Sequence, residues 1–181
     1  MEDDDLIDRF VKPTLAGETI GSLAVTEPGG GSDVAGIRTR AVRDGDHYVI
    51  NGAKTFITSG VRADFVTTAV RTGDDGHGGI SLVVVEKGTP GFTVDRSLTK
   101  MGWHCSDTAE LSYVDVRVPV ENLVGQENKG WDYAKFLLGN ERVGIARIGS
   151  SKRLLAQAKA YAREVTVGGR PLAEDPRMAD R

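Results

Sequence analysis

The chain has 181 residues, of which 39% are hydrophobic and 27% charged, and its formal net charge is −3. This length and composition predict a folded domain with its own core, and they exclude the strongly basic footprint of a nucleic-acid-binding protein. No apolar run is long enough to span a bilayer, and the acidic start Met1–Asp5 lacks the basic region of a signal peptide. The single cysteine, Cys105, excludes an intrachain disulfide and predicts no metal site.

A short helix is predicted at the start of the chain. Apolar residues recur there at helical spacing, at Leu6, Ile7, Phe10 and Val11. We expect Lys12-Pro13 to end this helix, because proline cannot continue it.

From Ser22 to Val124 the pattern changes to short apolar runs separated by turn residues, which is typical of strands. The candidate strands are Ser22–Val25, Ile37–Arg43, His47–Ile50, Lys54–Thr58, Phe65–Val70, Ile80–Glu86, Phe92–Leu98 and Glu110–Val116. Asp44-Gly45 and Asn51-Gly52 lie between candidate strands and predict hairpin turns. About eight short strands joined in this way predict an antiparallel β-barrel, closed or nearly closed, within an α+β fold.

From Lys129 onward the spacing becomes helical, and one long helix is predicted from Trp131 to about Glu164, ended by Gly168–Pro171. Its apolar residues lie on several faces, at Leu137, Leu138, Ile145, Ile148, Leu154 and Leu155. A helix that is apolar over a wide arc normally lies inside a bundle. We therefore expect the chain to be part of a longer protein that supplies the missing partners.

The most informative motif is Ala24–Gly36, with the sequence AVTEPGGGSDVAG. An apolar strand ends in the hydroxyl of Thr26 and the carboxylate of Glu27, and a proline turn leads into three glycines. Glycines leave the backbone bare, so its N–H groups can approach an anion closely between the hydroxyls of Thr26 and Ser32. A flexible turn between two strands is the alternative interpretation of a glycine triplet alone.

The whole motif resembles the flavin-contacting signature of the acyl-CoA dehydrogenase family. The same resemblance is carried by Asn51–Gly60, Thr89–Phe92, Met101–Thr108, Asp115–Pro119 and Asn122–Gly125. It implies a remnant of an N-terminal helical domain in residues 1–20, a β-barrel that binds flavin and acyl-CoA in residues 21–126, and the incomplete start of a C-terminal helical domain in residues 127–181.

The resemblance implies an oxidoreductase that acts on CH–CH groups, by FAD-dependent α,β-dehydrogenation of an acyl-CoA thioester. In that family a carboxylate takes the α proton and flavin N5 takes the β hydride, while the protein holds the groups in place. The residues matched to the cofactor are Leu23, Ala24, Val25, Thr26, Gly31, Ser32, Phe56, Ile57 and Thr58. Thr26 and Thr58 would offer hydroxyls to the flavin edge, and Phe56 would lie against the ring, where many members have tryptophan. Ser32 would lie by the pyrophosphate and would also bind the substrate near its thioester.

Glu141 is the candidate catalytic base, because it lies on the predicted long helix among apolar or small residues. Those at helical spacing from it are Leu137, Leu138, Gly144, Ile145 and Ile148. Desolvation on such a stripe raises the pKa of a carboxylate toward that of a useful base. The resemblance places the catalytic glutamate of some members at this position and matches Arg142 to an arginine beside the substrate. The alternative is an ion pair between helices, with the base beyond Arg181.

Three other groups of polar residues are expected to be structural. Glu27 beside a proline closes its turn rather than contacting a ligand. His104 and Cys105 are adjacent, and adjacent side chains of an extended strand point to opposite faces, so they form no nucleophile pair. Asp107 and Thr108 are expected to fix their loop by hydrogen bonds.

The partners that the resemblance implies are an acyl-CoA substrate, an electron-transfer acceptor, and further copies of the complete enzyme in a homo-oligomer. We expect a cytoplasmic location, or the mitochondrial matrix for a eukaryotic source, although no transit peptide is seen. Two alternatives stay open. A sister flavoenzyme such as an acyl-CoA oxidase or a nitroalkane oxidase would differ in the oxygen reactivity of its reduced flavin, and a non-catalytic remnant would bind no flavin.

Overall fold

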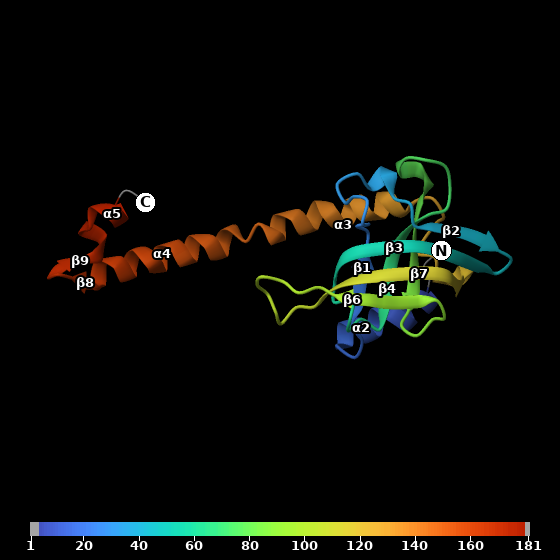
Figure 1. Ribbon diagram of the computed structural model, residues 1–181, viewed down its shortest axis with the longest axis horizontal. Helices are drawn as coiled ribbons and strands as arrows, with labels where there is room; N and C mark the ends of the chain where they lie inside the picture. The colour runs from blue at the N-terminus through green and yellow to red at the C-terminus, as the bar shows by residue number, and fades with distance from the viewer. Residues whose placement is uncertain (1–3, 180–181) are drawn as a thin grey trace. The chain divides into compact units, whose positions relative to one another are not determined.

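The computed structural model describes residues 4–179 of the chain. Two compact units can be distinguished, one ending at Ala134 and the other beginning at Lys135. The first contains a curved β-sheet with a helical segment at its N-terminus, and the second is mostly helical (Figure 1).

The N-terminal segment is helical beyond the point where the sequence predicted its end. It consists of α1 (Asp4–Leu6), a π-helical turn (Ile7–Val11) and α2 (Lys12–Ala16), and it ends at Gly17 with φ 77°. The expectation that Lys12-Pro13 ends the helix is therefore wrong. The π turn accommodates Pro13 within the helical segment. The N–H of Lys12 donates to the carbonyl oxygen of Ile7, five residues earlier, and this wider turn leaves space for the proline ring.

This segment packs on the sheet through its buried face. Leu6 and Phe10 are buried beside Val84, and the rings of Phe10 and Phe65 lie 4.8 Å apart. Nη2 of Arg9 donates to Oε1 of Glu86 at 2.7 Å. Apolar packing and one partly exposed ion pair thus hold the segment to β4 and β5.

Seven strands form one mixed sheet in the described part of the chain. They are β1 (Gly21–Ala24), β2 (Arg40–Asp44), β3 (His47–Thr58), β4 (Phe65–Arg71), β5 (Ile80–Glu86), β6 (Phe92–Ser97) and β7 (Thr108–Pro119). Their order is β1-β4-β2-β3-β7-β6, with β5 paired to β4, and the sheet curves into a half-barrel (Figure 1). The α+β class is confirmed, but the antiparallel barrel of about eight strands is corrected to a mixed half-barrel.

The parallel pairs are β1–β4 and β2–β4, and the other pairs of this sheet are antiparallel. A period-two pattern identifies the side chains that share a face, but it carries no information on the direction of the neighbouring strand. β1 and β2 both run parallel to β4, and strands that run in the same direction need a long connection, which residues 25–39 provide between these two. This segment contains the glycine-rich motif, whose local pattern did not predict the parallel topology.

One predicted hairpin turn is confirmed and the other is wrong. Asp44 pairs with His47 across a two-residue turn in which Gly45 has φ 62°. Asn51-Gly52 instead lies inside β3, which joins two predicted strands into one of twelve residues.

The Asn51 side chain closes a bulge in β7 rather than a turn. The register passes from Ile50↔Val116 to Gly52↔Tyr113, so β7 has one extra residue there, and Asp115 has φ 51°. Nδ2 of Asn51 donates to Oδ1 of Asp115 at 3.0 Å, and the N–H of Asp115 donates to Oδ1 of Asn51 at 2.9 Å. This bulge reverses the phase of β7, so Tyr113 and Val116 both face the core.

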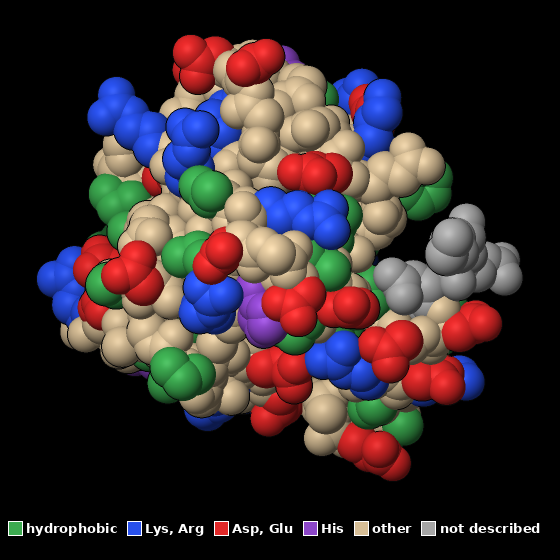
Figure 2. Space-filling view, turned by 90° about the vertical axis from the view of Figure 1, so that its right-hand side faces the viewer, with side chains coloured by type: hydrophobic (Ala, Val, Ile, Leu, Met, Phe, Trp, Pro, Cys, Tyr) green, Lys and Arg blue, Asp and Glu red, His purple; other side chains and the backbone are tan. Residues whose placement is uncertain are grey.

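The main hydrophobic cluster is formed mostly by residues of the sheet strands. Its fully buried members include Tyr48, Ile50, Ile57, Val66, Val70, Val83, Val85, Leu111, Tyr113 and Val116. The hydroxyls of Tyr113 and Thr68 lie 3.0 Å apart, so both buried polar groups are hydrogen-bonded. On the outer surface drawn in Figure 2, basic and acidic side chains are interspersed.

The helical part from Gly130 onward consists of α3 (Gly130–Ile145) and α4 (Ile148–Glu164), so the prediction of one long helix is wrong. The break lies at Arg147, which has φ 47°. A two-stranded hairpin, β8 (Thr166–Val167) and β9 (Arg170–Pro171), and α5 (Pro176–Ala179) follow. Most apolar side chains expected to need partners are exposed, namely Leu137, Ile145, Ile148, Leu154 and Leu155. Within residues 4–179 no helix combines the length and the apolar character needed to cross a membrane.

The bulge in β7 predicts opposite outcomes for two valines of that strand. Val116 is 0% exposed and Val114 is 63% exposed. Val116→Ala should lower the free energy of unfolding by about 2–3 kcal/mol through lost burial and a residual cavity, whereas Val114→Ala should change it by less than about 0.5 kcal/mol. Urea denaturation measures both changes. Equal losses would contradict the assignment of Val116 to the core face of β7 and of Val114 to its outer face.

Candidate functional site

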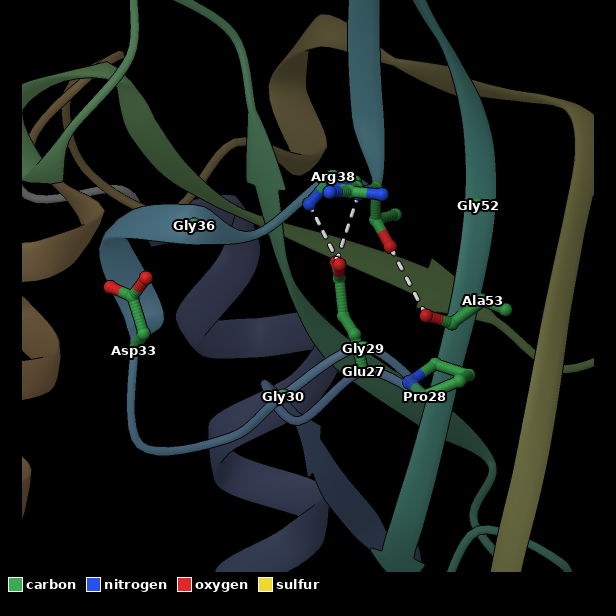
Figure 3. A pocket seen from close by; sticks show the side chains of 10 residues that line it. Glu27, Pro28, Gly29, Gly30, Asp33, Gly36, Arg38, Gly52 and Ala53 are labelled. Carbon is green, nitrogen blue, oxygen red and sulfur yellow. Dashed lines mark hydrogen bonds between the residues drawn. The ribbon is translucent and has the colours of Figure 1, made fainter.

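A buried ion pair lies between the glycine-rich loop and β3. Lys54 is 0% exposed, and its Nζ donates to Oε1 of Glu27 at 2.9 Å and to the carbonyl oxygen of Val25 at 3.0 Å. Glu27 is 8% exposed and also accepts from the N–H of Thr39 (2.9 Å) and from the N–H of Arg38 (2.7 Å). Figure 3 shows the Glu27 side chain reaching from its loop to this backbone. The pair therefore connects three chain segments.

The pKa values of both members of the pair are lowered, that of Lys54 by burial and that of Glu27 in spite of burial. Burial lowers the pKa of Lys54 from 10.5 to about 8, against the opposing effect of the Glu27 charge. For Glu27, burial by itself raises the pKa, but the hydrogen bonds from Thr39 and Arg38 and the charge of Lys54 together lower it below the ordinary value of 4.5. At neutral pH both side chains are therefore charged.

The glycine-rich loop lies against Thr26. A Cβ added to Gly31 would lie 2.9 Å from Cγ2 of Thr26, so this close approach requires glycine, whereas one added to Gly29 or Gly30 would meet nothing within 4 Å. The loop, the Arg38 region and β3 near Ala53 line a cavity of about 440 Å³ (Figure 3). Bare backbone beside a cavity of this kind suits a ligand that carries an anionic group.

A bulge in β3 turns Phe56 outward. The register passes from Lys54↔Leu111 to Ile57↔Ala109, so β3 has one extra residue there. Phe56 has φ 59°, and its side chain is 67% exposed, while Lys54 and Thr55 are both buried. The bulge thus directs the ammonium inward and the aromatic ring to the surface.

The two segments predicted to contact a cofactor are hydrogen-bonded to each other. The N–H of Thr55 donates to the carbonyl oxygen of Thr26 at 2.9 Å, and Oγ of Ser22 donates to the carbonyl oxygen of Thr58 at 2.6 Å. The structure therefore brings Leu23–Thr26 and Phe56–Thr58 together.

The residues predicted to contact the cofactor differ in the exposure of their side chains. Ala24 and Ile57 have side chains in the core, so only their backbone could contact a ligand. Val25 and Thr26 are half-buried, and the exposed members of the set are Leu23, Gly31, Ser32, Phe56 and Thr58.

The candidate base and its neighbour belong to the second unit. Glu141 lies on α3 and is exposed, and the side chain of Arg142 lies outside the described residues. Ile148 begins α4 after the break, so it does not extend the apolar stripe that the sequence predicted beside Glu141. The described residues of this unit leave that carboxylate in contact with solvent.

The loop after β6 contains the other polar candidates. Asp107 accepts from the N–H of Val61 at 2.8 Å and from Nε of Arg62 at 2.5 Å, which confirms its role in fixing the loop. Nε2 of His104 lies 2.9 Å from the carbonyl oxygen of Lys100, and Cys105 is exposed. Among residues 4–179 no group of histidine, cysteine and carboxylate side chains could hold a metal ion.

Lys54 was not among the residues predicted from the sequence, and Glu27 was expected only to close its turn. The available signal was a single lysine at a position where the alternation of its strand, continued from Ile50, points to the core. A buried lysine needs an anionic partner. This requirement indicates Glu27, the carboxylate at the start of the glycine-rich loop.

Comparison with known proteins gives consistent matches along the chain. Residues 22–116 match the family description "Acyl-CoA dehydrogenase, middle domain", and residues 128–181 match "Acyl-CoA dehydrogenase, C-terminal domain". The mouse (Mus musculus) mitochondrial long-chain specific acyl-CoA dehydrogenase is 40% identical over 172 residues, which are 92% of this chain and 40% of the mouse protein.

Solved structures with the same fold include two bacterial proteins. A probable acyl CoA dehydrogenase from Mycobacterium abscessus is 62% identical with a TM-score of 0.92, and the match covers 98% of this chain and 48% of that one. Butyryl-CoA dehydrogenase from Megasphaera elsdenii is 36% identical with a TM-score of 0.88, over 98% of this chain and 47% of that one. The chain thus spans less than half the length of these relatives.

The lowered pKa of Lys54 predicts a rise in stability with pH. Between about pH 8 and 10.5 the unfolded chain holds the Lys54 proton more tightly than the folded chain, so the unfolding free energy rises with pH, by at most about 1.4 kcal/mol per pH unit. Lys54→Met removes this contribution. The difference in unfolding free energy between parent and variant, measured by urea denaturation at pH 7, 8, 9 and 10, should widen above pH 8, and a constant difference would contradict this assignment.

Proposed function

The chain belongs to the acyl-CoA dehydrogenase family, and from this we propose that it forms part of an enzyme that carries out FAD-dependent α,β-dehydrogenation of an acyl-CoA thioester. The observation that carries the proposal is the joining of Leu23–Thr26 to Phe56–Thr58 beside a bare glycine loop. These are the segments that the family resemblance matches to the flavin.

We assign the parts of such an enzyme as follows. Residues 1–20 belong to an N-terminal helical domain, residues 21–126 form the flavin- and acyl-CoA-binding domain, and residues 127–181 begin a C-terminal helical domain. The exposed apolar side chains of α3 and α4 support this assignment, because helices of this kind bury such side chains against bundle partners.

The residues of the first unit fit a flavin. Thr26 places a half-buried hydroxyl against the Gly31 backbone, Ser32 and Thr58 expose hydroxyls, and Phe56 presents an aromatic ring to the surface. Bound FAD supplies the hydride acceptor of the reaction. The chain's part is to hold the ring edge by the threonine hydroxyls, to support the ring with Phe56, and to bind the pyrophosphate near Ser32 and the Gly31 backbone.

The family resemblance also gives roles in substrate binding and activation to Ser32, Arg142 and Glu141. Ser32 contacts the thioester end, Arg142 binds the substrate, and Glu141 takes the α proton. Substrate and further helices of the complete enzyme would cover the exposed Glu141 carboxylate, and desolvation then raises its pKa toward that of a useful base. The acyl-CoA substrate, an electron-transfer acceptor and a homo-oligomeric assembly are part of the same proposal, as is a location in the cytoplasm or the mitochondrial matrix.

An optical spectrum tests the cofactor, and two glycines provide a matched pair of variants. Gly31→Ala should displace Thr26 and weaken FAD binding by about tenfold or more, because the added Cβ has no room. Gly78→Ala, a change outside the glycine-rich loop, should leave binding within about twofold, because its Cβ meets nothing within 4 Å. FAD titration of the full-length protein measures both. A parent protein that binds no flavin would refute the function, and equal effects of the two variants would refute the position of the site.

Glu141→Gln tests the base. In the full-length protein this variant should reduce exchange of the substrate α proton by about 100-fold or more while FAD stays bound, because the amide cannot accept the proton. Glu164→Gln, a matched change at the end of α4, should leave the exchange rate unchanged. Exchange at the parent rate in Glu141→Gln would show that another residue is the base. In a separate measurement on the parent protein, rapid reaction of the reduced flavin with oxygen would favour an oxidase.

A further inference from the structure

We infer that Glu27 and Lys54 are positioning residues of the flavin site: their buried ion pair fixes the glycine-rich loop and the bulge of β3 as one rigid surface. This inference rests on the proposed function, because it concerns the segments assigned to the cofactor. It gives Glu27 a role different from ligand contact and different from closing its own turn.

The charged groups of both side chains are bonded to protein partners, although Glu27 also lines the cavity beside the glycine-rich loop. Lys54 is 0% exposed, and its ammonium already donates to Val25 and Glu27. Glu27 accepts three hydrogen bonds, from Lys54, Arg38 and Thr39, and is nearly enclosed. Because these bonds tie both charged groups to neighbouring segments, we infer that the pair acts on a cofactor through the segments that it joins.

Those segments are the ones that carry the proposed cofactor contacts. Lys54 is the residue before the bulge that turns Phe56 outward, and the next N–H, that of Thr55, is bonded to Thr26. On the other side, Glu27 follows Thr26 directly and precedes the three glycines. A shift of the pair would thus move Thr26 and Phe56 relative to each other.

A second contact, between Gly52 and Thr39, helps to hold the same geometry. A Cβ on Gly52 would lie 2.6 Å from Cα of Thr39, so β3 and the Thr39 backbone pack without a side chain between them. Oγ1 of Thr39 donates to the carbonyl oxygen of Ala53 at 3.3 Å (Figure 3). The backbone that donates to Glu27 is therefore held against the strand that carries Lys54.

The experiment separates positioning from stability by removing both charges together. Lys54→Met alone leaves a buried carboxylate without its cation and should destabilise the full-length protein strongly. The double variant Glu27→Gln/Lys54→Met leaves no unpaired charge and should regain most of the lost thermal midpoint. We expect its dissociation constant for FAD to stay at least tenfold above that of the parent, with an altered visible flavin spectrum and faster amide hydrogen exchange in residues 28–39.

An exposed ion pair provides the matched control. Arg117 and Asp44 form a 2.8 Å pair in which both side chains are more than half exposed. Arg117→Met/Asp44→Asn should leave FAD affinity and spectrum unchanged. FAD affinity within twofold of the parent in Glu27→Gln/Lys54→Met, or in Glu27→Gln alone if the double variant does not fold, would overturn the inference and leave the proposed function intact. A parent protein that binds no FAD would instead overturn both.

Discussion

The buried ion pair of Glu27 and Lys54 is the constraint on which the first unit depends. It joins the end of β1, the backbone that enters β2, and β3, which are separated in sequence and carry different parts of the site. Buried ion pairs contribute little net stability, because the loss of hydration offsets their attraction, but removing one partner destabilises by about 3–5 kcal/mol. The pair is therefore better explained by the geometry that it imposes than by the stability that it adds.

Two bulges determine which side chains face the core and which face outward. In β7 the extra residue beside Asp115 keeps Tyr113 and Val116 on the core side although they are three residues apart. In β3 the extra residue allows Lys54 and Thr55 both to be buried and sends Phe56 to the surface. Each bulge interrupts the strict alternation of a strand at the point where an irregular placement serves the core or the site.

Each of the two units contains some of the candidate functional residues. The first unit holds the glycine-rich loop, the hydroxyls and the outward ring, all fixed by hydrogen bonds within that unit. The second contains Glu141 on α3, exposed, together with apolar helix faces that its described residues do not cover. The proposed cofactor contacts are thus preorganised within the first unit, whereas the environment that would desolvate the candidate base must come from groups packed on α3.

The sequence by itself determined where most strands lie, because burial on one face imposes a local period, and it determined the family, because the loop motif is local and chemically specific. It misassigned Asn51-Gly52 as a turn and α3 with α4 as one helix, since the same short signals serve turns, bulges and helix breaks. Strand direction and the pairing of Lys54 with Glu27 were decided only by the tertiary structure. Both depend on contacts between distant segments, such as Lys54 with a carboxylate 27 residues earlier in the chain, and no local pattern records such contacts.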